Sequence, residues 1–175
     1  DKERRIEEEL EKARRDHKED VDRDRERLKE VREEHERLVR ENKKRLEEIR
    51  KELEDRGIER ELLEEARKLL EDLKRKHEEL SRRSEELIKR SEEKLKRLSD
   101  ESERLLRELR EKLKRGEVPM EDLLREVKRV VEKNKEDLKR LHDENEKLAE
   151  ENRRRLKKSH DEVEKVAEDL KRKAK

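Results

Sequence analysis

Five histidines occur among serine, asparagine and aspartate residues at regular spacing, and these are the side chains that could do chemistry. Histidine beside serine and an acid can form a nucleophile with its base, and histidine can also bind Zn²⁺. A nucleophile needs a substrate cavity and an oxyanion site as well, and the sequence indicates neither. No histidine pair has the helical i, i+4 spacing of a zinc site, and the chain has no cysteine. We therefore expect no enzyme activity, no metal site and no cofactor.

The charges of the chain are almost balanced. Its 175 residues include 57 Lys or Arg and 56 Asp or Glu, so the formal net charge is +1, and there is no aromatic residue. Balanced charge gives no long-range attraction to nucleic acid or to an anionic membrane, and no aromatic ring is available to stack on bases. We also find no apolar stretch that could span a bilayer and no targeting signal. We expect no nucleic-acid or membrane partner and a soluble chain compatible with cytosolic recombinant expression, while its location stays unknown.

A composition of 65% charged and 25% hydrophobic residues is typical either of disorder or of long helices. Gly57 and Gly116 suit left-handed helix ends, and Pro119 suits the first turn of a helix. They divide the chain into predicted helices over about 1–56, 59–115 and 119–175, each roughly 80 Å long at about 1.5 Å per residue. Short turns between them predict an all-α, up-down-up antiparallel three-helix bundle that forms one domain over residues 1–175.

The apolar residues of each helix form one seam, meaning a row on a single face. The row repeats after 18 residues, which is five turns at about 3.6 residues per turn, so the helices should be nearly straight rather than supercoiled. This regularity excludes disorder and an isolated charged helix. In the second helix the predicted seam includes Leu62, Leu69, Leu73, Leu80, Leu87, Leu98 and Leu105. A second apolar strip at Leu70, Ile88 and Leu106 is predicted to face the third helix.

Twelve seam positions are polar, and none of them is Lys, Arg or Glu. At one height of an antiparallel pair, the two residue numbers add to a constant, and this rule aligns the polar positions, with Asp24 about one turn out of line. The resulting layers are His17–Ser102–Asn134, Asp24–Ser91–Asn145, His35–Ser84–Asn152 and Asn42–His77–Ser159. Their donors and acceptors match, and an unpaired buried polar group costs about 1–3 kcal/mol. We interpret the layers as hydrogen-bond networks rather than as tolerated core substitutions.

Two further histidines lie beside the seam. The same rule pairs His142 with Ser99 and His160 with Ser81 across the second and third helices. The alternative is that both histidines are simply half-exposed on the surface.

Equal helices, glycine-ended turns, the 18-residue repeat and the His/Asn/Ser layers together resemble de novo designed helical bundles with buried hydrogen-bond networks. The resemblance covers the whole chain, although its apolar content is low for such a protein. It implies that the polar layers specify helix pairing and register, and that histidine-containing layers respond to acid.

The function predicted on this basis is structural, with acid sensitivity as a further expectation. A neutral histidine in the seam must be desolvated to carry charge, which depresses its pKa in the folded state and makes stability fall in acid. The alternative function is a coiled-coil module, similar to a spectrin repeat, that binds partner helices. We expect a monomer that requires no partner, with self-association left open.

Overall fold

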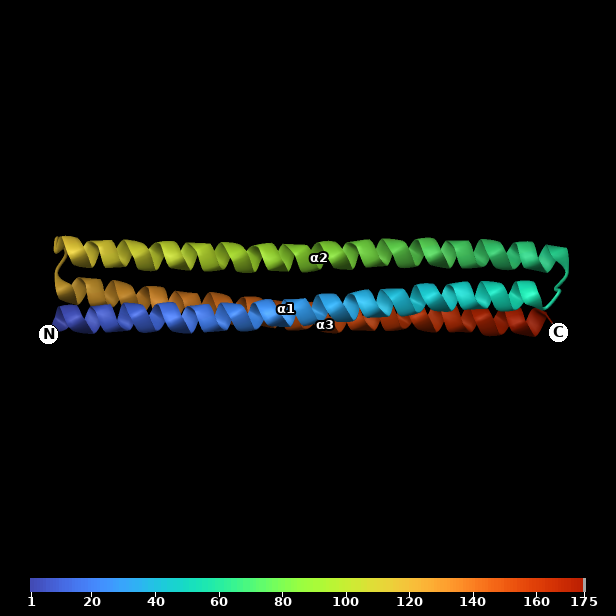
Figure 1. The fold of residues 1–175 in the computed structure, drawn as a ribbon, viewed down its shortest axis with the longest axis horizontal. Coiled ribbons are helices and arrows are strands. Elements are labelled where there is room, and N and C mark those ends of the chain that lie inside the picture. Colours follow the sequence, from blue (N-terminus) through green and yellow to red (C-terminus); the bar gives the residue numbers. More distant parts are fainter. Residues whose placement is uncertain (175) are drawn as a thin grey trace. The chain divides into compact units, whose positions relative to one another are not determined.

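The computed structural model describes residues 1–174, and it consists of three long helices. They are α1 (Lys2–Asp55), α2 (Arg60–Arg115) and α3 (Met120–Lys173), drawn in Figure 1. No strand occurs within these described residues. The all-α three-helix prediction is confirmed, and the helices begin and end close to the predicted positions, except that the predicted end at 175 lies outside the described residues.

The helix ends follow from the residues that occupy them. Gly57 and Gly116 both have a φ of 64°, the left-handed conformation that L side chains adopt only at a cost. At the start of the chain, Oδ1 of Asp1 accepts a hydrogen bond from the backbone N–H of Glu3 at 3.2 Å. Pro119 was expected in the first turn of α3, but it immediately precedes that helix, and its carbonyl accepts the hydrogen bond from Leu123 at 3.0 Å.

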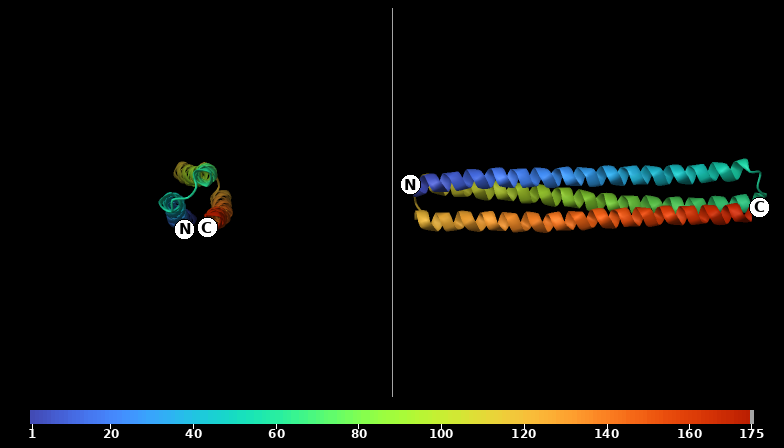
Figure 2. Two further views of the ribbon diagram at one scale, coloured as in Figure 1. Left: turned by 90° about the vertical axis from the view of Figure 1, so that its right-hand side faces the viewer. Right: turned by 90° about the horizontal axis from the view of Figure 1, so that it is seen from below.

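Contacts between side chains show the direction of each helix. Between α1 and α3 the contacting residue numbers rise together, so these helices are parallel. The contacts of α2 run in opposite order along both neighbours, so α2 is antiparallel to them. The pairs are Lys2–Glu121, Arg27–Glu146 and Arg45–Glu164 for α1–α3, Glu11–Arg110 and Glu54–Arg67 for α1–α2, and Lys112–Glu126 and Lys94–Glu144 for α2–α3. Each helix therefore contacts the other two, and their ribbons run side by side in Figure 2.

The chain divides into two compact units, and every helix contributes to both. Unit 1 contains Asp1–Lys29 and Lys89–Lys147, and unit 2 contains Glu30–Ile88 and the residues from Leu148 onward. In each unit, buried Leu, Ile, Val and Ala from all three helices form the core. The single domain expected from the sequence stays a prediction. Each unit is therefore a three-helix core with its own set of buried polar residues.

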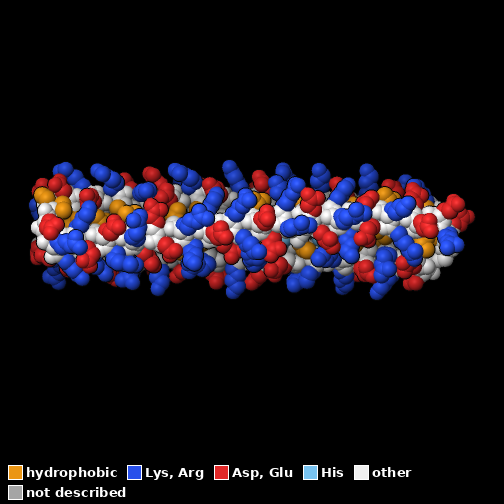
Figure 3. Space-filling view, turned by 90° about the horizontal axis from the view of Figure 1, so that it is seen from above, with side chains coloured by type: hydrophobic (Ala, Val, Ile, Leu, Met, Phe, Trp, Pro, Cys, Tyr) orange, Lys and Arg blue, Asp and Glu red, His pale blue; other side chains and the backbone are white. Residues whose placement is uncertain are grey.

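The buried face of α2 differs from the predicted one. The strip of Leu70, Ile88 and Leu106 is buried at 0–7% exposure, although the sequence placed it at the edge of the seam. Leu69 is 38% exposed, and of the other predicted seam leucines in this range Leu95 is buried at 2% exposure. The rest are only half-buried: Leu62, Leu73, Leu80, Leu87, Leu98 and Leu105. Apolar residues cover a wider arc on α2 than on α1, and contacts with two neighbouring helices decide which part of that arc is buried. Figure 3 shows hydrophobic side chains visible between the charged ones on the displayed face.

Candidate functional site

The buried polar residues are the candidate functional site, because apolar residues alone could pack the core. Among residues 1–174, ten polar residues are buried, and all ten belong to the twelve predicted from the seam. The other two, Ser91 and Ser159, are half-buried, as are Ser81, Ser99 and His160, whereas His142 is exposed. The buried ones are His17, Asp24, His35, Asn42, His77, Ser84, Ser102, Asn134, Asn145 and Asn152.

In unit 1, the residues predicted to meet at His17 form one hydrogen bond. The Asn134 amide Nδ2 donates to Oγ of Ser102 at 2.6 Å. Neither ring nitrogen of His17 has a hydrogen-bond partner. Burial lowers the pKa of His17, and the nearby carboxylates of Asp20 and Glu103 oppose this shift. The layer therefore contains one bonded pair and a neutral imidazole without a partner.

In unit 2, the layer at His35 bonds differently. Nδ2 of Asn152 donates to Nδ1 of His35 at 3.2 Å, while Oγ of Ser84 has no partner. Because an amide N–H can only donate, Nδ1 must carry its lone pair, so this contact requires the neutral ring. Burial lowers the pKa of His35, against opposing contributions from Glu85, the backbone of Ser81 and Glu36.

These two layers have identical residue types. His17, Ser102 and Asn134 lie 18 residues from His35, Ser84 and Asn152 respectively, so the repeat places the same three side chains at the same helix faces. The asparagine bonds to serine in unit 1 and to histidine in unit 2. One asparagine amide therefore has two possible partners in such a layer, and each unit uses a different one.

The layer at His77 gives the most complete set of contacts. Nε2 of His77 donates to the carbonyl of Val39 at 3.3 Å, and Oγ of Ser159 lies 3.5 Å from Nδ1. Asn42 was predicted to join them, but its Nδ2 donates to the carbonyl of Leu156 at 3.3 Å. Burial lowers the pKa of His77, with Lys43 and His35 adding to the shift and the Val39 bond and Glu78 opposing it.

The layer predicted from Asp24, Ser91 and Asn145 forms no hydrogen bond among its own members in the described chain. Asn145 is 1% exposed, and neither Nδ2 nor Oδ1 of its amide has a partner. Asp24 instead accepts a hydrogen bond from Nδ1 of His142 at 3.0 Å. Asp24 therefore bonds to α3 through His142 rather than through the residues predicted to share its layer.

Both histidines beside the seam contact α1 rather than the serines of α2. His142 meets Asp24 in unit 1, and Nδ1 of His160 donates to Oδ1 of Asn42 at 3.1 Å in unit 2. The pairs His142–Ser99 and His160–Ser81 are therefore not the contacts that these histidines form. The sequence could have predicted these contacts. In parallel helices the difference between contacting residue numbers is constant, and here it is 118 for both pairs.

A row of ion pairs between α1 and α3 was also not anticipated. Nε and one Nη of Arg27 donate to the two carboxylate oxygens of Glu146, at 2.6 and 3.1 Å, and Arg45 bonds to Glu164 through the same two nitrogens. Arg153 and Glu34 form a third such pair, and all three have a separation of 119 residues. Bidentate pairs of this kind fix geometry as well as contributing energy.

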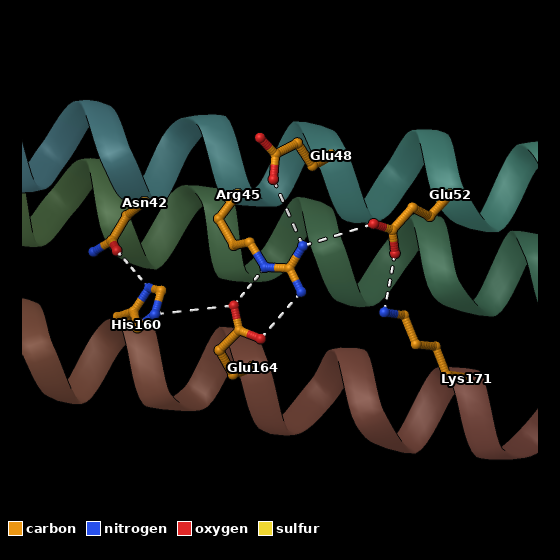
Figure 4. A network of polar contacts seen from close by, with 7 residues as sticks. All are labelled: Asn42, Arg45, Glu48, Glu52, His160, Glu164 and Lys171. Atoms are coloured by element: carbon orange, nitrogen blue, oxygen red, sulfur yellow. Dashed lines mark hydrogen bonds and ion pairs between the residues drawn. The ribbon is translucent and has the colours of Figure 1, made fainter.

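In unit 2 these charged pairs continue the contacts of His160, as Figure 4 shows. Nε2 of His160 lies 3.9 Å from Oε1 of Glu164, and Lys171 lies 3.0 Å from Glu52. The hydrogen bond from Arg45 is the main reason why the pKa of Glu164 is lowered, and the bond from Lys171 does the same for Glu52. The bond to Glu164 likewise raises the pKa of Arg45. The network contains ion pairs that need their carboxylates ionised.

Ser159 and His77 form a serine–histidine contact, but the other ring nitrogen of His77 bonds to a backbone carbonyl rather than to a carboxylate. Over residues 1–174 no group of three or more His, Asp or Glu residues is positioned to hold a metal ion. The same stretch has no helix both long and apolar enough to cross a membrane.

No protein-family model, curated protein or solved structure matches this chain.

Proposed function

We propose that the protein is a structural scaffold of the de novo designed type, whose buried polar residues specify helix register and whose buried histidines make the fold sensitive to acid. The observation that carries the proposal is the burial of His17, His35 and His77, at 1–6% exposure. A core chosen only for stability would fill these positions with leucine, as the repeat itself does at Leu53 and Leu95.

Register follows from the cost of unpaired polar groups. The bonds Asn134–Ser102 and Asn152–His35 each join α3 to a different neighbour, so together they constrain all three helices. A slip of one helix would place asparagine opposite leucine, and each unpaired amide would cost about 1–3 kcal/mol. The bidentate Arg–Glu pairs between α1 and α3 favour the same alignment.

Acid sensitivity follows from the direction of the histidine pKa shifts. Burial lowers the pKa of all three buried histidines in the folded state. As the pH falls through about 6.5, the unfolded chain therefore takes up protons before the folded chain does. The stability that the neutral histidines contribute is present above that pH and is lost progressively until the pH passes the folded-state pKa.

Thermal unfolding between pH 7.5 and pH 5 tests this proposal. We expect the Tm of the parent chain to fall across this range. The substitutions His17→Leu, His35→Leu and His77→Leu, combined in one variant, place the residue type of the repeat at each position, and the Tm should then change far less with pH. A variant with His160→Gln, which replaces a half-buried histidine, is the matched control and should keep the parental slope. A parental Tm that is constant over this range would reject the acid-response proposal.

A further inference from the structure

The two units differ in the histidine chemistry that they contain. Unit 1 has one buried histidine, His17, and unit 2 has two, His35 and His77. The two in unit 2 lie close enough to repel each other when both are charged. Protonation in unit 2 therefore requires two desolvated charges that disfavour one another, whereas unit 1 requires one.

The partners of exposed His142 and half-buried His160 also differ, and this difference again favours unit 1 in acid. His142 in unit 1 donates to Asp24, a carboxylate with a side chain only 10% exposed. Its counterpart in unit 2, His160, donates to the neutral amide of Asn42, and Asn42 lies 18 residues from Asp24 on the same face of α1. His142 therefore has a carboxylate oxygen at 3.0 Å, on a side chain that is largely removed from solvent.

A charge on His160 would meet less electrostatic attraction than a charge on His142. Its closest carboxylate oxygen, on Glu164, is 3.9 Å away, and that carboxylate already binds both nitrogens of the Arg45 fork. A charge on His160 therefore adds to an ion pair that is complete without it, and it gains no contact with Asn42 beyond the hydrogen bond that the neutral ring already donates.

Other charges near the buried histidines do not reverse this difference. His17 faces Asp20 on its own helix and Glu103 on α2. His35 faces Glu36 on α1 and Glu85 on α2, with the neutral Asn152 from α3. His77 faces Lys43 from α1 and Glu78 on α2, with the neutral Ser159 from α3. Each of these histidines thus has a carboxylate nearby, and His77 alone among them also faces a lysine and a second histidine.

We infer that acid opens the two units in order, with unit 2 losing its packing first while the Asp24–His142 pair holds unit 1 together. The buried apolar clusters of unit 1 and unit 2 share no residue, so one region can lose protection by local opening while another keeps it. The inference rests on the proposed acid sensitivity and adds where in the chain that sensitivity lies.

Hydrogen exchange of the full chain, measured by mass spectrometry at pH 7 and pH 5 and corrected for intrinsic exchange rates, tests the order. Between these two pH values, we expect protection factors in 30–88 and 148–174 to fall at least about tenfold more than those in 1–29 and 89–147, the factor that corresponds to one pKa unit. Equivalent positions 24 and 42 allow a matched test, because each can be given the residue found at the other. Asp24→Asn gives unit 1 the residue of unit 2 and should add opening in unit 1, and Asn42→Asp gives unit 2 a carboxylate beside His160 and should protect it.

The outcomes separate this inference from the proposed function. Equal loss of protection in both units would overturn the order and leave the acid sensitivity in place. A larger loss in unit 1, or no effect of Asp24→Asn and Asn42→Asp on their own units, would also overturn it. Protection that is unchanged everywhere at pH 5 would reject the acid sensitivity itself and the order with it. Circular dichroism at pH 7 checks that both variants are fully helical before exchange.

Discussion

At the scale of single residues, the polar core is only partly bonded. Three of the four predicted layers contain a direct bond: Asn134–Ser102, Asn152–His35 and Ser159–His77. The sequence predicts which polar residues lie in the seam and at which level along the helices, because both depend on helix periodicity. It could not supply the partner of each amide, because an asparagine between a serine and a histidine can bond to either, and the two units show both choices.

Asn145 is the residue whose replacement is expected to stabilise the protein. Its amide is buried without a partner, and its counterpart 18 residues further along α3 is the buried Val163. We expect Asn145→Val to raise the free energy of unfolding by about 1–3 kcal/mol, the cost of the unpaired amide. Urea denaturation measures the change. Asn134→Val is the control and should destabilise the protein, because it leaves Ser102 without its donor; a loss of stability on Asn145→Val would contradict the argument.

At the scale of helices, the sequence predicts the elements better than their faces. Glycine and proline determine where helices end, so α1, α2 and α3 agree closely with expectation. The buried face of α2 was placed too far toward Leu69, because its apolar residues span more of the helix than two neighbours can cover. The contacts of His142 and His160 were misassigned because antiparallel pairs alone were aligned, although α1 and α3 are parallel and contact each other directly.

The turn between α2 and α3 depends on backbone conformation rather than on space. Gly116 has a φ of 64°, and a Cβ atom added there would meet nothing within 4 Å. We therefore expect Gly116→Ala to lower the free energy of unfolding by about 1–2 kcal/mol, because an L residue is strained at positive φ. Gly116→Asn should cost less, since asparagine tolerates this region. Equal losses for the two variants, measured by urea denaturation, would point to a cause other than φ.

At the scale of the whole molecule, the chain carries two kinds of acid-sensitive group with different physical origins. The buried histidines are neutral because they are desolvated. The carboxylates of Glu164, Glu52 and Glu121 have a lowered pKa because they accept bonds from Arg45, Lys171 and Lys2 respectively. Both kinds favour the folded state at neutral pH, but they lose their effect in different pH ranges.

We expect the Tm to fall in two steps as the pH is lowered. The first begins near pH 6.5, where the unfolded chain protonates its histidines before the folded chain does. The second begins near pH 4.5, where the unfolded chain protonates glutamates that stay ionised in the folded state, and it continues until the pH passes their lowered pKa.

Salt should distinguish the steps, because the Debye length shrinks from about 10 Å at 0.1 M to about 3 Å at 1 M. Added salt weakens exposed ion pairs but not desolvation, so Tm measured from pH 7 to pH 3 at both concentrations should show a smaller second step and an unchanged first one. A first step that shrinks with salt as much as the second would mean that surface charge, rather than histidine burial, causes the loss of stability above pH 5.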